Sequence, residues 1–512
     1  MANLALKRTK PQPDIPDVWI PLEPTEGRRA QKLARSGAIT RVAAGVYVNA
    51  VDPEKRASDE LGPVALLTRR HWQFILGHIA PGAVISHLSA ISSGITPGNE
   101  ITLSHPTRFN TKVRLPGVTA VFLPGPGPLP GDFPLGTSGL YWSSRPRQLL
   151  ENLGRVLKAN PRTTGRAGVE EKLIEILNAS GERALNAIRD EARALTDPLG
   201  AQDRFETLNQ IIGALLGTYA KGSLVTRHGA LVASGTPADK ERLGRFTILA
   251  DALRATPLPD LNDVAATDPS RTHFAFLESY FSNFVEGTRF SIKEAEEIAL
   301  HNKIVQNRPK DSHDIQAVFQ MILDSRYRAV LPTAVDILDG LRERHRQMLE
   351  NRPEVSPGEF KTEVNFAGTT RFTEPAFVRG TLLEGVKLAN SVPEGLPRAI
   401  YWAFLVSEIH PFSDGNGRLS RLLMNAELSR CGKCRIIIPT LFHDEYVDAQ
   451  RALSRGDNPA PMIAALGYIA KWGTAFNYGN LEEVIDVMQR ANSFQEDRRE
   501  FKLLMPEQLA RN

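Results

Sequence analysis

The stretch "HPFSDGNGRLSR", residues 410–421, decides how the C-terminal half of this chain folds. Upstream of it, apolar residues continue up to Ile409 as in a buried helix, and Pro411 disfavours helical geometry at His410, so the helix is expected to end there. Downstream, leucines recur at helical spacing until Gly432, a typical helix stop. The stretch therefore predicts a helix, an Asp-Gly-Asn-Gly loop and a second helix.

The predicted loop has the composition of an anion site. Gly415 and Gly417 allow the backbone to turn its amide hydrogens inward, and the helix that follows adds the positive end of its dipole. Arg418 and Arg421 are three positions apart, so they are expected on one helix face and aimed at one place. Two guanidinium groups above a nest of amides suit a polyphosphate better than a single carboxylate, because they can contact several oxygens at once.

Two further side chains of the loop can supply chemistry. Asp414 can hold the Mg²⁺ that accompanies a nucleotide triphosphate, since this ion takes one or two carboxylates together with phosphate oxygens. His410, with an ordinary pKa of about 6.5, can accept a proton from an attacking hydroxyl near neutral pH. Each residue taken singly is also explained by an ordinary turn or helix cap. A turn alone, however, requires neither two arginines nor a histidine followed by Pro-Phe.

The stretch resembles the signature of the Fic family, His-Pro-Phe-x-[Asp/Glu]-Gly-Asn-Gly-Arg-x-x-Arg, and fills every fixed position of it. The resemblance implies a protein adenylyltransferase, a nucleotidyltransferase that uses ATP and Mg²⁺. In the implied reaction a Ser, Thr or Tyr hydroxyl of a target protein attacks the α-phosphorus, takes AMP and releases pyrophosphate. Relatives that phosphorylate instead replace the glycine before the first arginine with lysine, and Gly417 keeps the common form.

The resemblance also implies a role for each motif residue. His410 would be the general base, Phe412 the buried anchor that fixes the loop, and Asp414 the Mg²⁺ ligand. The residues implied to contact the phosphates are Gly415, Asn416, Gly417, Arg418 and Arg421.

A second motif lies upstream, in a helix predicted at about residues 271–287. Ser282-x-x-x-Glu286-Gly287 resembles the inhibitory signature [Ser/Thr]-x-x-x-Glu-[Gly/Asn] of Fic proteins. An acid in the last helical turn opposes the helix dipole by roughly 0.3–1 kcal/mol, so helix stability does not explain Glu286. The resemblance implies that Glu286 pairs with Arg421 and displaces the γ-phosphate of ATP. Without the downstream motif, Glu286 would be interpreted as an exposed residue at a frayed helix end.

The segment "EFKTEVNFAGTTRFTEPAFV", residues 359–378, alternates polar with β-branched or aromatic residues around Ala367-Gly368 and predicts a hairpin. In Fic proteins a hairpin flap covers the site and aligns the target segment as an added strand. An ordinary surface hairpin is the alternative. The candidates for target contact are Thr370, Arg371 and Phe372.

Residues 27–48 hold five basic residues and no acidic one. Ser36-Gly37 is a predicted turn, and Arg41 to Tyr47 a predicted strand or wing, which together indicate a small winged-helix unit. Up to about residue 195 the sequence resembles AbiEi-type antitoxins, which regulate transcription through an N-terminal winged helix. That resemblance implies DNA as a partner, whereas a solvated basic face is the alternative.

The expected fold is mostly α, with an all-helical Fic domain that carries a small β-hairpin flap and is preceded by an α+β winged-helix-like domain. A Pro/Gly-rich stretch at 123–136 is predicted to be loop rather than sheet. The predicted parts are a winged-helix/AbiEi-like N-terminal domain (1–155), a helical connector (156–245), a Fic domain (246–475) and a helical tail (476–512).

The composition of the 512 residues bears on the location of the protein and on the role of its cysteines. No apolar run reaches the roughly 18–20 residues that span a bilayer, and "MANLALKRTKPQP" lacks a signal-peptide core, so a cytoplasmic protein without a membrane partner is expected. Cys431 and Cys434 argue against a disulfide scaffold and are poor evidence for zinc. The net charge of +4 decides nothing by itself.

Three functions remain open at this stage. The first is an AMP transferase that is restrained by its own Glu286 and acts on the hydroxyl of a target protein. The second is a DNA-binding regulator whose Fic domain serves as a sensor. The third is removal of AMP at the same site, and a homo-oligomer is compatible with all three.

Overall fold

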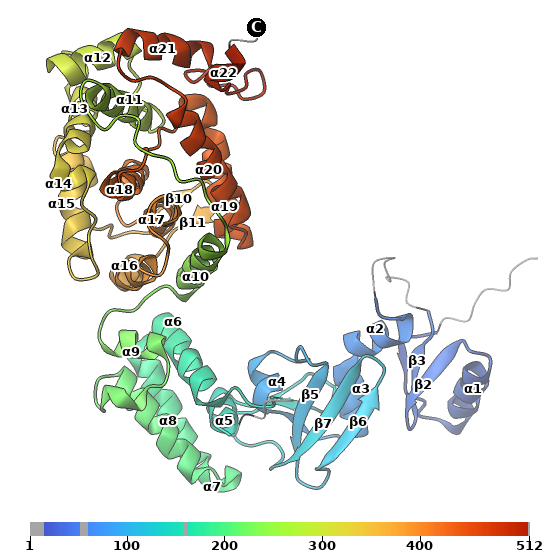
Figure 1. Ribbon diagram of the computed structural model, residues 1–512. Coiled ribbons are helices and arrows are strands. Elements are labelled where there is room, and N and C mark those ends of the chain that lie inside the picture. Colours follow the sequence, from blue (N-terminus) through green and yellow to red (C-terminus); the bar gives the residue numbers. More distant parts are fainter. Residues whose placement is uncertain (1–14, 52–59, 155, 157–160, 510–512) are drawn as a thin grey trace, which may run out of the picture. The chain divides into compact units, whose positions relative to one another are not determined.

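The computed structural model (Figure 1) describes residues 15–51, 60–154, 156 and 161–509. The chain forms two compact units, Met1–Ala233 and Ser234–Asn512. The stretch 1–13, on which the prediction of no signal peptide rests, lies outside the described residues. In the described ranges, no helix combines the length and the apolar character that a bilayer crossing requires.

The first described segment is a helix packed on a three-stranded antiparallel sheet with strand order β1-β3-β2. Buried Ala30 of the helix joins Ile39 and Tyr47 of the sheet in a small core. The turn between β2 and β3 contains Gly45 at φ 71°, a value that favours glycine. The predicted turn at Ser36-Gly37 is present, and the predicted strand or wing from Arg41 to Tyr47 is divided between β2 and β3 by a turn. The winged-helix assignment stays a prediction. The elements are β1 (Val18–Trp19), α1 (Pro24–Arg35), β2 (Ile39–Ala43) and β3 (Val46–Asn49).

A second sheet of six strands follows, in the order β6-β7-β5-β4-β9-β8. Its two longest strands are the parallel pair β5 and β7, whose buried side chains share a core with α2 and α3. The Pro/Gly-rich stretch 123–136 is mostly loop, as predicted, but residues 123–124 end β7 and Phe133–Pro134 forms the edge strand β8, where a proline without an N–H is tolerated. The elements are α2 (Pro63–Arg70), α3 (Trp72–Ile79), β4 (Val84–Ile85), α4 (His87–Ile91), β5 (Glu100–His105), β6 (Thr111–Leu115), β7 (Val118–Pro124), β8 and β9 (Tyr141–Trp142).

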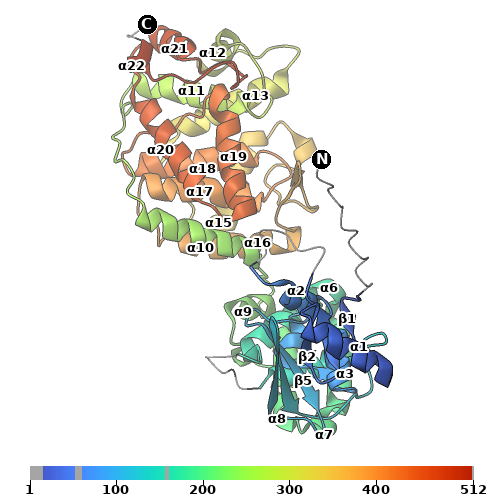
Figure 2. The same cartoon turned by 90° about the vertical axis from the view of Figure 1, so that its right-hand side faces the viewer.

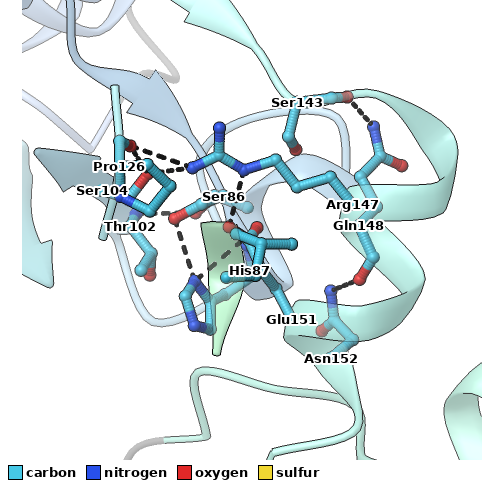
Figure 3. A network of polar contacts seen from close by, with 12 residues as sticks. Ser86, His87, Thr102, Ser104, Pro126, Ser143, Arg147, Gln148, Glu151 and Asn152 are labelled. Carbon is cyan, nitrogen blue, oxygen red and sulfur yellow. Dashed lines mark hydrogen bonds and ion pairs between the residues drawn. The ribbon is translucent and has the colours of Figure 1, made fainter. Parts of the chain in front are cut away.

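A fully buried arginine, Arg147 of α5 (Arg145–Asn152), ties this sheet to the helices that follow (Figure 3). Its guanidinium donates to Asp132 Oδ2 at 2.7 Å, to Glu151 Oε1 at 2.8 Å and to Ser104 Oγ at 2.7 Å. It also donates to two backbone carbonyls of the Pro/Gly-rich stretch. One buried cation therefore neutralises two carboxylates and fixes a loop, a strand and a helix together.

Four helices complete the first unit, and their core includes Leu149 and Leu150 of α5. The longest of them is interrupted at Gly181, which has φ 74° and ψ −179°. The division between the units falls after Ala233, so most of the predicted connector 156–245 packs with the first unit. The helices are α6 (Gly165–Ala194), α7 (Thr196–Leu199), α8 (Gln202–Leu215) and α9 (Arg227–Ala233), with a 3₁₀ turn at Lys221–Ser223.

The second unit is built around two helices, α17 (Leu396–Ile409) and α18 (Asn416–Arg430), which pack against each other inside a ring of other helices (Figures 1 and 2). Nearly every residue of α17 is buried, which is the reason that its sequence is apolar on all sides. The surrounding helices are α10 (Lys240–Ala255), α11 (Ser270–Phe284), α12 (Ile292–His301), α13 (Pro309–Leu323), α14 (Ser325–Arg328), α15 (Ile337–Leu349), α16 (Pro375–Ala389), α19 (His443–Gly456), α20 (Ala460–Thr474), α21 (Leu481–Arg490) and α22 (Pro506–Leu509).

The predicted fold class is confirmed, because a helical C-terminal unit follows a sheet-containing N-terminal unit. The predicted hairpin is present as β10 (Phe366–Ala367) and β11 (Thr370–Arg371), with Gly368 at φ 59° between them. Val484 and Met488 of α21, within the predicted helical tail 476–512, belong to the same core as α17. The division at residue 475 stays a prediction.

Replacing Arg147 with Ala should destabilise the first unit by roughly 3–5 kcal/mol, because two buried carboxylates lose their common partner. Urea unfolding of the full chain, followed by circular dichroism, measures the loss. Arg145→Ala is the matched control, since Arg145 lies on the same helix with an exposed side chain. Equal losses in the two variants would contradict the role assigned to Arg147.

Candidate active site

His410 lies where α17 ends and the loop begins. Its backbone adopts left-handed geometry, φ 53° and ψ 61°, which turns the chain sharply after Ile409. The imidazole stacks on Phe372, the residue that follows β11, with ring centroids 3.8 Å apart and planes inclined by 11°. Its Nδ1 lies 3.3 Å from the carbonyl oxygen of Ser407, and since a carbonyl only accepts, Nδ1 carries the proton. Nε2 is thereby left with a lone pair.

The surroundings of His410 keep its ring neutral. Burial lowers the pKa of His410 to about 4, the Ser407 carbonyl opposes that shift, and the Lys361 ammonium adds to it. Lys361 is itself buried, donates to Asn365 Oδ1 at 2.7 Å and has no ion pair among the described residues. Burial lowers the pKa of Lys361 to about 7. A neutral imidazole is the form that a general base requires.

The loop is closed by reciprocal hydrogen bonds. Asn416 Oδ1 accepts from the backbone N–H of Phe412 at 2.9 Å, and Asn416 Nδ2 donates to the Phe412 carbonyl, also at 2.9 Å. The Phe412 ring is fully buried and stacks on His345 at 3.8 Å. Phe412 thus occupies the position of an anchor, as the resemblance implies. The Asn416 side chain is engaged with the loop itself, so a phosphate would have to be bound by backbone amides here.

His345, on α15, stacks on Phe412 and also contacts the loop at Asp414. Its Nδ1 accepts from the backbone N–H of Gly358 at 2.9 Å, so Nε2 carries the proton and donates to the Asp414 carbonyl at 3.0 Å. Burial lowers the pKa of His345 to about 4, which keeps this neutral tautomer. The ring therefore fixes the carbonyl of the residue that is expected to hold the metal ion.

The two glycines of the loop, Gly415 and Gly417, are required for different reasons. Gly415 has φ 76°, and a methyl group there would lie 2.7 Å from Leu349 Cδ1. Gly417 has ordinary helical geometry, but a methyl group there would overlap the carboxylate of Glu286. The absence of a side chain at Gly417 therefore provides the space in which Glu286 lies.

Glu286 and Arg421 are in direct contact, as the resemblance to Fic proteins implies. Arg421 Nη2 donates to Glu286 Oε1 at 2.7 Å, while its Nε donates to Ser282 Oγ at 3.0 Å. Burial opposes ionisation of Glu286, but the Arg421 charge and hydrogen bond prevail and lower its pKa below the ordinary value. The helix ends earlier than predicted, at Phe284, and Gly287 at φ 94° turns the chain after Glu286.

Arg418 does not point to the same place as Arg421, which corrects the expectation drawn from their spacing. Arg418 Nη1 donates to Asp314 Oδ2 at 3.0 Å, and Nη2 lies 3.5 Å from Asp414 Oδ2. Asp314 is fully buried on α13 and also accepts from Arg352 Nε at 2.7 Å, so Arg418 is one of two cations that neutralise it. Of the two motif arginines, Arg421 lines the candidate site and Arg418 does not.

A cavity of about 250 Å³ lies beside His410. Of the predicted residues, it is lined by His410, Gly417, Arg421, Glu286, Thr370 and Phe372. Arg371 of the hairpin is exposed and pairs with Glu374 instead. The lining also includes residues that the sequence analysis missed, among them Ser407, Ser420, His443, Tyr446 and Arg451.

Asp414 is the one predicted metal ligand, and its side chain is 51% exposed. No group of three or more His, Cys, Asp or Glu side chains that could hold a metal occurs in the described part of the chain. A single accessible carboxylate fits Mg²⁺, which retains water and takes further oxygens from phosphates. It does not fit zinc, which needs three or four protein ligands.

The region that contains these residues matches a known protein family. Residues 335–428 match the model of the family described as "Fic/DOC family". The chain therefore carries a Fic domain. The matched residues extend from just before α15 into α18 and include His345 and the whole loop 410–421.

The Fic region is also similar to two proteins named as adenylyltransferases. Protein adenylyltransferase Fic of Drosophila yakuba is 27% identical over 225 residues, 43% of this chain and 44% of that protein. Protein adenylyltransferase fic-1 of Caenorhabditis elegans is 26% identical over 206 residues, 39% of this chain and 40% of that protein. The match thus spans less than half the length of either relative.

Among solved structures, a Fic-domain-containing signalling protein from Bacteroides thetaiotaomicron is 19% identical, with a TM-score of 0.36. The alignment covers 47% of this chain and 97% of that one.

We expect His410 to titrate near pH 4 rather than near pH 6.5, and to stay neutral from pH 8 down to about 5. Replacing Lys361 with Met should raise the pKa of His410, because a positive charge that disfavours protonation is removed. NMR titration of ring-labelled histidines in the full chain measures both values, with the His410 signal assigned by its loss in His410→Ala. Lys310→Met is the control, since Lys310 is half exposed and paired with Glu354. An unchanged pKa in Lys361→Met would show that Lys361 does not act on His410.

Proposed function

We propose that this chain is a protein adenylyltransferase that transfers AMP from ATP to a Ser, Thr or Tyr hydroxyl of a target protein. The proposal rests on one cavity. It is lined by the neutral imidazole of His410, by Arg421 and by Gly417 in the first turn of α18. Nucleotidyl transfer depends mainly on positioning and charge neutralisation, and these groups supply both. The names of the similar Drosophila and Caenorhabditis proteins support the same reaction.

In the proposed reaction, the target hydroxyl oxygen forms a bond to the α-phosphorus while the bond to pyrophosphate breaks. His410 Nε2 takes the hydroxyl proton, and the Ser407 carbonyl holds the opposite nitrogen in the tautomer that this step needs. The amides at the start of α18 and the Arg421 guanidinium bind the phosphates. Asp414 would hold Mg²⁺, which supplies positive charge to the leaving pyrophosphate.

We further propose that Glu286 restrains this reaction. Its carboxylate lies over Gly417 and occupies Arg421, the one motif arginine that lines the cavity. A γ-phosphate that needs Arg421 has to displace a negative charge from the same guanidinium. ATP is then held in a pose from which the α-phosphorus does not meet the hydroxyl.

Replacing His410 with Ala should reduce AMP transfer by roughly 10²–10⁴-fold, the usual contribution of a general base, with ATP affinity nearly unchanged. Transfer is measured with α-labelled ATP and cell lysate, and affinity by calorimetry. His301→Ala is the control, since that histidine is exposed at the end of α12. Full transfer by His410→Ala would show that another group takes the proton.

Replacing Glu286 with Gly should raise self-AMPylation by roughly 5- to 150-fold, the range of a typical coupling between sites. The labelled bands in lysate would also show the size of the target. Glu496→Gly is the matched control, because Glu496 is likewise a loop glutamate 3.1 Å from one arginine, but is exposed and outside the cavity. Equal labelling by Glu286→Gly and the parent would contradict the restraint.

The partner assignments remain predictions. DNA as a ligand of the first unit is supported by the basic residues of α1 and by the helix and hairpin at 24–49. A cytoplasmic location rests on the sequence alone. Removal of AMP at the same site is the alternative reaction, and release of labelled AMP from a modified target by the parent chain would favour it.

A further inference from the structure

A second cavity of the C-terminal unit, of about 360 Å³, is lined by three arginines. Arg271 lies in the first turn of α11, Arg328 ends α14, and Arg435 follows α18. Asp263 is the one acidic residue of the lining, and its Oδ1 already accepts from the backbone N–H of Ala265 at 2.8 Å. We call this cavity the arginine pocket.

Arg435 is 98% buried, since 2% of its surface is exposed. Its Nη1 donates to Glu278 Oε2 at 2.9 Å, and its guanidinium lies 4.4 Å from the ring centre of Phe274. Among the described residues, neither Nε nor Nη2 has a hydrogen-bond partner. A buried guanidinium with unused donors is costly unless a ligand or water completes its hydrogen bonds.

The other two arginines are also poorly compensated. Arg328 Nη1 donates to the Leu323 carbonyl at 2.8 Å, and no carboxylate of the described residues lies within ion-pair distance of it. Arg271 has Asp268 at 3.8 Å, a distant partner. Burial lowers the pKa of Arg328, and the charges of Arg271 and Arg435 lower it further, while Asp263 and Asp268 oppose them. Arg435 is paired with Glu278 and Arg271 with Asp268, so Arg328 is the arginine of this cavity for which the described residues provide no ion pair.

The arginine pocket is separate from the candidate active site. None of its three arginines lines the cavity beside His410. Arg271 lies in the first turn of α11 and Glu286 lies two residues beyond its last residue, and this helix of 15 residues is about 22 Å long at 1.5 Å per residue. A ligand in one cavity therefore does not occupy the other.

We propose that the arginine pocket binds a multiply charged oxyanion of the phosphate class, with inorganic pyrophosphate as its simplest example. Planar guanidinium groups match phosphate oxygens two at a time, and the N-terminal end of α11 adds its positive dipole. Three guanidinium groups on one cavity offer more hydrogen-bond donors than the two oxygens of a carboxylate can accept from, which favours a ligand with several oxygens.

The test is calorimetric titration of the full chain with pyrophosphate in an Arg421→Gln background, which removes the arginine of the candidate active site. Binding is expected to persist in that background. Adding Arg271→Gln and Arg328→Gln should weaken it by roughly tenfold or more per arginine, the usual effect of a lost charge-assisted hydrogen bond. Sodium acetate at equal ionic strength should give no comparable heat.

Arg326→Gln is the matched control, because Arg326 lies on the same short helix as Arg328, pairs with Asp324 and is outside the pocket. It should leave binding unchanged. Arg435→Lys keeps a positive charge beside Glu278 but loses the planar guanidinium group, so it should weaken pyrophosphate binding. Without ligand, the thermal unfolding midpoint of this variant should stay near that of the parent. No binding in the Arg421→Gln background, or equal weakening by Arg326→Gln, would overturn the proposal. The readout is binding, so it is independent of any AMP transfer.

Discussion

The pair of hydrogen bonds between the Asn416 side chain and the backbone of Phe412 is the constraint on which the C-terminal unit depends. It closes the loop between α17 and α18, and the buried Phe412 ring then secures the loop against His345. Once the loop is fixed, the left-handed turn at His410 and the start of α18 are fixed as well. The imidazole of His410 and the backbone of Gly417 in the first turn of α18 then line one cavity.

Local sequence was sufficient for the parts of this site that depend on neighbouring residues. The end of α17 before Pro411 and the hairpin around Gly368 both follow from short-range rules. The contact between Glu286 and Arg421 was expected only through the resemblance to Fic proteins. The spacing of the two residues in the chain contains no information about it.

The missed or misdirected features depend on contacts far apart in the sequence. Arg418 turns to Asp314, which lies 104 positions away, so helical spacing to Arg421 could not reveal its direction. His345 is 69 positions from the carbonyl that it holds, and a lone histidine on a helix carries no local signal. The six-stranded sheet of the first unit was not predicted because three of its strands have two residues each, too few for an alternating pattern.

The stacking of Phe372 on His410 joins two tasks in one segment of chain. The hairpin strands β10 and β11 lead directly into the aromatic ring that lies flat against the imidazole. A movement of the hairpin would therefore carry that ring with it and alter the support of the imidazole. Under the proposed AMP transfer, the hairpin would then act on the orientation of the base.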